Sequence, residues 1–208
     1  VCWFTAADSA HLLPILALAG AAFAALLVDA IAPHGSGKPA LPYVALGGIV
    51  LSAVAVAATW MKPMIALHGS LALGPFAASL AALVLGAAAI AVLYSVDYAR
   101  HMGFDHGEYY GLVLLAASGM VYLVAANDIV SIFVAFELMS LSVYSLVAIG
   151  RGDPRGGEGA MKYFVLGAMT SGFLLYGLAL LYGATGTIYL ADMAGAASGP
   201  AEARGIVL

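Results

Sequence analysis

Six long apolar stretches dominate this chain of 208 residues. A helix that crosses the hydrocarbon layer of a membrane needs about 20 mostly apolar residues, because each residue advances the helix by about 1.5 Å. The stretches lie at residues 11–31, 41–60, 73–96, 109–126, 129–149 and 157–182. They predict an all-α fold, a bundle of about six transmembrane helices within a single membrane domain.

The composition excludes a soluble domain and several kinds of site. The chain is 64% hydrophobic and 9% charged, with a mean hydropathy of +1.04, whereas soluble domains carry about 25% charged residues. The net charge of −4 and the lack of a basic run argue against nucleic acid as a partner. Cys2 is the only cysteine, which rules out an internal disulfide and any cysteine-based metal cluster.

Short polar segments separate the predicted helices. Only Asn127-Asp128 joins the fourth and fifth stretches, so these two helices are expected to be antiparallel neighbours with Asp128 as the N-cap of the fifth. Asp153-Pro154 has the pattern of a helix start and predicts where the sixth helix begins. The segment 184–204 is too short and too polar to span the membrane. It is expected to be an interfacial link with room for a short helix.

The basic residues of the loops predict the orientation in the membrane. Cytoplasmic loops carry the excess of Lys and Arg in membrane proteins. The richer side holds four basic residues and the other side two: Lys38, Arg100, Arg151 and Arg155 against Lys62 and Arg204. This distribution predicts an N-terminus on the outer side.

One carboxylate lies in the middle of an apolar run. Glu137 stands well inside the 129–149 stretch, where a charged side chain costs about 2.5–3.5 kcal/mol on insertion scales. Ser140 and Tyr144 share its helical face and offer hydroxyl groups. Ionisable residues inside membranes commonly mark proton or ion paths, so Glu137 is the first candidate site residue. The alternative is a structural hydrogen bond to a neighbouring helix.

Two other ionisable residues fall within the apolar runs. Asp29 lies near the end of the first stretch and is expected to be an interfacial group. Lys162 lies in the sixth stretch, within about 6 Å of the depth of Glu137 by helical rise. A buried Glu137–Lys162 pair is therefore predicted, in which movement of the lysine would load or unload the glutamate with a proton. In the alternative reading, Lys162 extends to the cytoplasmic surface and pairs with Glu158, one turn earlier.

The stretch around Glu137 resembles a known family. Asn127-Asp128, FELMSLSVY at 136–144, MKYFVLGAMTSGFLLYG at 161–177 and LYGATG at 181–186, together with GEYY at 107–110, are similar to subunit N of the proton-pumping NADH:quinone oxidoreductase, respiratory complex I. The resemblance implies an antiporter-like fold of about fourteen helices, of which this chain would be a part. It also implies that Glu137 matches the family's channel glutamate and Lys162 an accompanying lysine.

The resemblance implies a function as well. The expected role is that of a multi-pass membrane-arm subunit in the bacterial inner membrane, a translocase subunit that helps move protons beside other membrane subunits of complex I. NADH, flavin, iron–sulfur clusters and quinone would be bound by partner subunits, so no cofactor and no metal are expected in this chain. The alternatives are a cation/proton antiporter or membrane hydrogenase subunit of the same superfamily, or a passive structural subunit in which Glu137 and Lys162 tie two helices together.

Overall fold

The computed structural model describes residues 6–31, 40–61, 64–102, 106–150 and 154–198, and six long helices dominate it. Each has a segment apolar and long enough to cross a membrane, which confirms the predicted helical bundle. The helices are α1 (Ala6–Ile31), α2 (Ala40–Thr59), α3 (Pro75–Met102), α4 (Gly107–Ala125), α5 (Ile129–Val147) and α6 (Pro154–Thr185). A short helix, α7 (Leu190–Ser198), lies in the segment expected to be an interfacial link.

Some sequence-based predictions concern residues outside the described ranges. These are Cys2, Asp153, residues 199–204 of the link and the loop cations Lys38, Lys62, Arg151 and Arg204.

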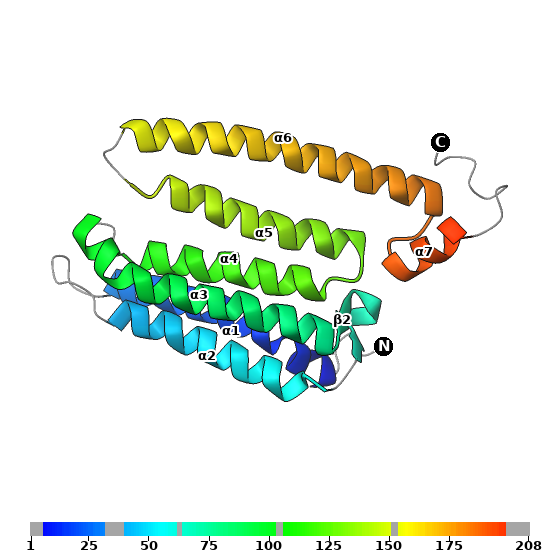
Figure 1. Cartoon of the computed structure of the whole chain (residues 1–208), viewed down its shortest axis with the longest axis horizontal. Helices are drawn as coiled ribbons and strands as arrows, with labels where there is room; N and C mark the ends of the chain where they lie inside the picture. Colours follow the sequence, from blue (N-terminus) through cyan, green and yellow to red (C-terminus); the bar gives the residue numbers. More distant parts are fainter. Residues whose placement is uncertain (1–5, 32–39, 62–63, 103–105, 151–153, 199–208) are drawn as a thin grey trace.

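The long helices form a bundle from which α6 stands out to one side (Figure 1). Helix α1 packs against both α2 and α4, and α3 covers α2 and α4 on another side. The buried core of this part joins side chains of all four helices, including Leu18, Leu41, Val92, Tyr110 and Leu114. Helix α5 then packs on α4, and α6 packs on α5. The chain therefore places α5, which carries Glu137, between α4 and α6.

Small residues allow the helices to approach closely. A Cβ atom added to Gly48 of α2 would overlap the Cβ of Ala21 in α1. A Cβ on Gly119 of α4 would lie 2.6 Å from the backbone nitrogen of Met139 and 3.0 Å from the carbonyl oxygen of Ala135, both in α5. Close backbone contact of this kind replaces the hydrophobic driving force that is missing between helices in lipid.

A β-hairpin precedes α3, and the sequence analysis did not predict it. Strands β1 (Met64–Ala66) and β2 (Leu71–Leu73) pair antiparallel around the 3₁₀ turn η1 (Leu67–Gly69). The third apolar stretch was expected to begin its helix at residue 73, but the helix begins at Pro75, where proline suits the first helical position. A strand of three residues is too short for its periodicity to differ from the start of a buried helix.

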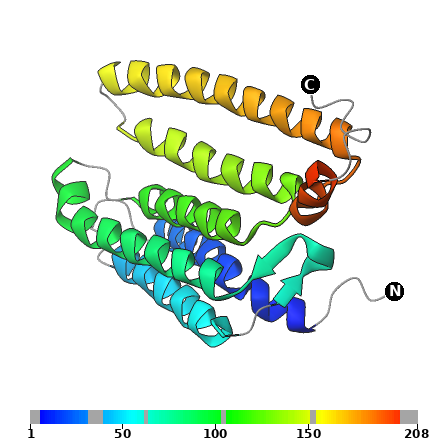
Figure 2. The same ribbon diagram turned by 45° about the vertical axis from the view of Figure 1, so that its right-hand side comes forward.

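The hairpin, the α4–α5 turn and the segment before α7 lie together at one end of the bundle (Figure 2), and hydrogen bonds join them. The Asn127 N–H donates to the carbonyl of Ser70 at 2.8 Å, and the Leu190 N–H donates to the carbonyl of Asn127 at 3.2 Å. The Tyr189 hydroxyl donates to the carbonyl of His68 at 3.1 Å. We call this assembly the hairpin cap; it fixes the starting point of α5.

Candidate functional site

Asp128 sets the register of α5 as the sequence predicted. Its carboxylate accepts hydrogen bonds from the N–H groups of Val130 (2.9 Å) and Ser131 (2.8 Å) and from the Ser131 hydroxyl (2.7 Å). Burial raises the pKa of this carboxyl, but the bonds from Ser131, Ser70 and Val130 outweigh burial, and the pKa lies below its usual 3.8. The predicted N-cap is confirmed, and Glu137 follows in the middle of α5.

Glu137 faces α6 rather than α4. Ala135 and Met139 meet Gly119 of α4. Each lies two residues from Glu137 along α5, and two residues correspond to a rotation of about 200° around the helix axis, so Glu137 lies on the opposite side from this contact. Tyr144 lies seven residues further on, nearly two full turns, so it shares the face of Glu137. The Tyr144 ring makes edge-on contacts with Tyr163 and Phe164 of α6, with ring centres 5.0 and 5.9 Å apart. The glutamate therefore points toward the α5–α6 interface.

The carboxylate of Glu137 has one buried oxygen that is not hydrogen-bonded within the described part of the chain. The side chain is partly buried, and this oxygen is its Oε1 atom. Ser140, one turn away on the same helix, is 6% exposed. A buried carboxylate oxygen without a bonded donor is costly. A buried polar group in this condition calls for a specific explanation, such as a catalytic role or a bound water molecule.

Lys162 lies on the other side of α6. Nine residues separate it from the buried Ser171, which is two and a half helical turns, so Lys162 faces away from α5. Its ammonium donates to Glu158 at 2.5 Å, and the two side chains are 71% and 66% exposed.

The buried Glu137–Lys162 pair predicted from the sequence is therefore not formed among the described residues. The prediction compared the depths of the two side chains but not their directions around the helix axes. The alternative reading, in which Lys162 pairs with Glu158, matches the observed contact.

Some small residues of α6 are buried or lie against another side chain, and others are exposed. Gly167 accommodates Tyr144, because a Cβ at this position would overlap the tyrosine hydroxyl. Ser171 is 7% exposed, and its Oγ atom is buried with no hydrogen-bond partner in the described part of the chain. Ala168 is exposed, and a Cβ on Gly172 would meet nothing within 4 Å. Ser171 was not among the site residues predicted from the sequence, where it is one of several small residues of the sixth apolar stretch.

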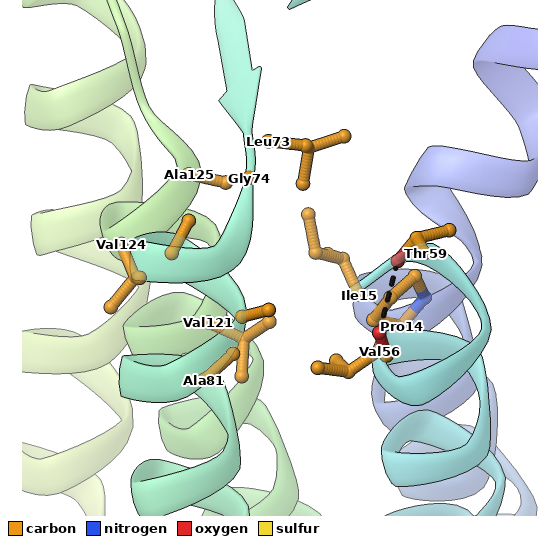
Figure 3. A pocket seen from close by; sticks show the side chains of 12 residues that line it. Pro14, Ile15, Val56, Thr59, Leu73, Gly74, Ala81, Val121, Val124 and Ala125 are labelled. Atoms are coloured by element: carbon orange, nitrogen blue, oxygen red, sulfur yellow. Dashed lines mark hydrogen bonds between the residues drawn. The ribbon is translucent and has the colours of Figure 1, made fainter. Parts of the chain in front are cut away.

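The remaining candidates lie elsewhere. Asp29, two residues before the end of α1, is partly buried against Gly107 at the start of α4. A cavity of about 30 Å³, enough room for a water molecule, lies beside the hairpin between α1, α2, α3 and α4 (Figure 3). Its lining is apolar apart from Thr59, whose hydroxyl donates to the carbonyl of Val56 at 3.2 Å. Within the described ranges no group of three or more His, Cys, Asp or Glu residues could hold a metal ion.

The known proteins that are similar to this chain agree with one another. The family described as "NADH:quinone oxidoreductase/Mrp antiporter, TM" matches residues 126–206. NADH-quinone oxidoreductase subunit N 1 of Koribacter versatilis is 38% identical over 192 residues, which is 88% of this chain and 37% of the relative. Subunit N of Azoarcus sp. is 51% identical over 106 residues, which is 51% of this chain and 22% of the relative. The chain thus spans less than two-fifths of the length of these relatives.

Solved structures share the fold. Respiratory complex I from Thermus thermophilus contains a chain with a TM-score of 0.71 and 32% identity, covering 93% of this chain and 40% of that one. An archaeal membrane-bound sulfane sulfur reductase gives a TM-score of 0.76 at 27% identity, covering 90% of this chain and 39% of that one. The Mrp complex from Dietzia sp. gives 0.73 at 25% identity, covering 91% and 21%.

The bundle and these similarities define the class: the chain has the fold of the antiporter-like membrane proteins. Within this class it is related to subunit N of NADH-quinone oxidoreductase, a membrane subunit of respiratory complex I. The resemblance read from residues 107–186 is thereby confirmed.

Proposed function

We propose that this chain is part of a membrane-arm subunit that helps to translocate protons in an NADH:quinone oxidoreductase, with Glu137 as a proton-binding group. The observation that carries the proposal is the buried Oε1 atom of Glu137 at the α5–α6 interface, in the middle of an apolar span, which has no hydrogen-bond partner among the residues that the structure describes. Ionisable residues within membrane spans commonly mark proton or ion pathways. NADH, flavin, iron–sulfur clusters and quinone would be bound by partner subunits.

Lys162 is the second residue of the proposal. A direct pair with Glu137 would require α6 to turn by about half a revolution, because Lys162 faces away from α5. We therefore treat Lys162 as a separate charge on the far face of α6, held by Glu158 in this structure. Protons would then move between the two faces of α6, and Glu137 and Lys162 would both take part without touching each other.

The proposed location is the bacterial inner membrane, with the N-terminus on the outer side. The hairpin cap lies at the end that holds the α2–α3 and α4–α5 connections, and in this orientation it faces outward. The support is the excess of basic residues in the opposite loops. Lipid and other membrane subunits of the complex are the expected partners.

A cation/proton antiporter or membrane hydrogenase subunit is the second candidate function. The similarity to the Mrp complex and to the archaeal sulfane sulfur reductase favours it. Replacing sodium by choline separates these functions, since an antiporter exchanging sodium for protons would lose proton movement and a proton pump would not.

The test replaces Glu137 by Gln in the full-length subunit of the assembled complex. The change removes the ionisable group but preserves side-chain volume, so NADH-driven proton uptake by inverted membrane vesicles should fall severely while complex assembly is retained. Ser145→Ala is the matched control, because Ser145 is exposed on α5 and its hydroxyl bonds the Leu141 carbonyl of its own helix. Pumping that survives Glu137→Gln would contradict the proposal and favour a passive structural subunit.

A further inference from the structure

Two buried polar side-chain atoms lack a hydrogen-bond partner among the described residues: Oε1 of Glu137 in α5 and Oγ of Ser171 in α6. Most side chains of α6 are exposed, whereas Ser171 is 7% exposed. An unbonded hydroxyl in an apolar interface is unfavourable unless a partner is within reach. The two unsatisfied atoms belong to the two helices that face each other.

The hydroxyl of Ser171 differs from the other hydroxyls of these helices. A serine or threonine inside a helix commonly bonds the carbonyl four residues earlier. Thr170 and Thr185 of α6 do so at 2.8 Å, and Ser142 and Ser145 of α5 do so at 2.7 and 2.9 Å. The structure gives Ser171 no such bond. Its hydroxyl is therefore free to bond a group on α5.

The register of the interface places Ser171 opposite Glu137. Tyr144 of α5 meets Phe164 and Gly167 of α6, which fixes one level of the antiparallel pair. Glu137 lies seven residues before Tyr144, and Ser171 lies seven residues after Phe164. In both helices seven residues correspond to about 10.5 Å and nearly two turns. Because the helices are antiparallel, both steps lead in the same direction and keep the facing sides.

We propose that Ser171 is the positioning residue for Glu137, bonding its carboxyl group directly or through one water molecule held between them. The inference rests on the proposed function of Glu137. A hydroxyl is both a donor and an acceptor. It can donate to the ionised carboxylate and accept from the protonated carboxyl, so it serves both states without a charge of its own. Only the O–H bond of Glu137 forms or breaks when the proton arrives or leaves.

The experiment compares Ser171→Ala with Ser171→Thr in the full-length subunit of the assembled complex. The first readout is infrared difference spectroscopy, in which the carboxyl band of Glu137 is the band that Glu137→Gln removes. Removing the hydroxyl should shift this band to higher frequency, since a protonated carboxyl group without a hydrogen-bond partner absorbs there. Proton uptake should fall roughly tenfold, as expected for a lost bond to a charged group. Threonine retains the hydroxyl and should restore both readouts.

Thr170→Val is the matched control, because it removes a hydroxyl that is exposed and already bonded to Leu166. It should leave the Glu137 band and proton uptake unchanged. If Ser171→Ala does not assemble, Ser171→Cys supplies the same comparison with a similar volume and a weaker donor.

The outcomes separate the two proposals. A band that stays at its wild-type frequency in Ser171→Ala would overturn the role of Ser171, even where Glu137→Gln abolishes pumping. Pumping that survives Glu137→Gln would instead overturn the proposed function, whatever the band does in the Ser171 variants.

Discussion

The hydroxyl of Tyr144 occupies the space that a Cβ atom on Gly167 would fill. This contact joins the two helices that carry the candidate residues and sets the face that each presents to the other. With Tyr163 and Phe164 around the same ring, it forms an aromatic contact that turns Glu137 toward α6. The glycine is therefore a requirement of the interface rather than a flexible point in the helix.

Gly167→Ala should destabilise the full-length protein by about 1–3 kcal/mol, the usual cost of overpacking. The added methyl group would push Tyr144 away and loosen the α5–α6 contact. Thermal unfolding in lipid nanodiscs measures the effect. Gly172→Ala is the control on the same helix, because a Cβ there meets nothing within 4 Å. Equal stability of the two variants would contradict the importance of the Tyr144–Gly167 contact.

Gly119→Ala should be at least as harmful as Gly167→Ala. The added Cβ would press on backbone atoms of Met139 and Ala135, and backbone of a helix cannot move aside as a side chain can. The expected loss is again about 1–3 kcal/mol in the free energy of unfolding. Gly47→Ala in α2, where nothing lies within 4 Å, should be neutral. A tolerated Gly119→Ala would show that α4 and α5 are packed less closely than in this structure.

Asp128 should make stability depend on acid pH. Its pKa is lowered in the folded protein, since the hydrogen bonds to its carboxylate outweigh burial. The stabilisation is fully present above the unfolded pKa of about 3.9 and is lost as the pH falls through the lower folded value. The unfolding temperature of the wild type should therefore decrease more between pH 5 and pH 3 than that of Asp128→Asn.

Removal of the cap should also be visible at neutral pH. Asp128→Ala should cost about 1–2 kcal/mol, as for other N-caps, whereas Asp97→Asn, a change at an exposed carboxylate, should cost little. An Asp128→Asn variant with the same acid sensitivity as the wild type would assign the pH dependence to other groups.

Lys162→Met should separate function from stability. The Lys162–Glu158 pair is largely exposed, and exposed ion pairs contribute about 0–1 kcal/mol. Unfolding in detergent should therefore change little, while NADH-driven proton uptake should fall if Lys162 binds a proton. Lys162→Arg keeps the positive charge and should keep the Glu158 pair. Unchanged pumping in Lys162→Met would remove Lys162 from the proposed site.

Much of the fold could be predicted from local sequence. The α4–α5 turn and the N-cap followed from Asn127-Asp128, because capping involves residues only two or three positions apart. The hairpin was missed, because its strands resemble apolar helix starts and its pairing depends on contacts with Asn127 and Tyr189 elsewhere in the chain.

The sequence by itself determined that six helices cross the membrane and that Glu137 lies within one of them, because hydrophobic length and charge are local properties. Only the tertiary structure decided which side chains face one another. These helices are apolar on nearly every side, so their pattern does not indicate the face that meets a neighbour. Steric fit at Gly119 and Gly167 fixes their rotation, and that rotation brings Ser171 toward Glu137 and turns Lys162 away.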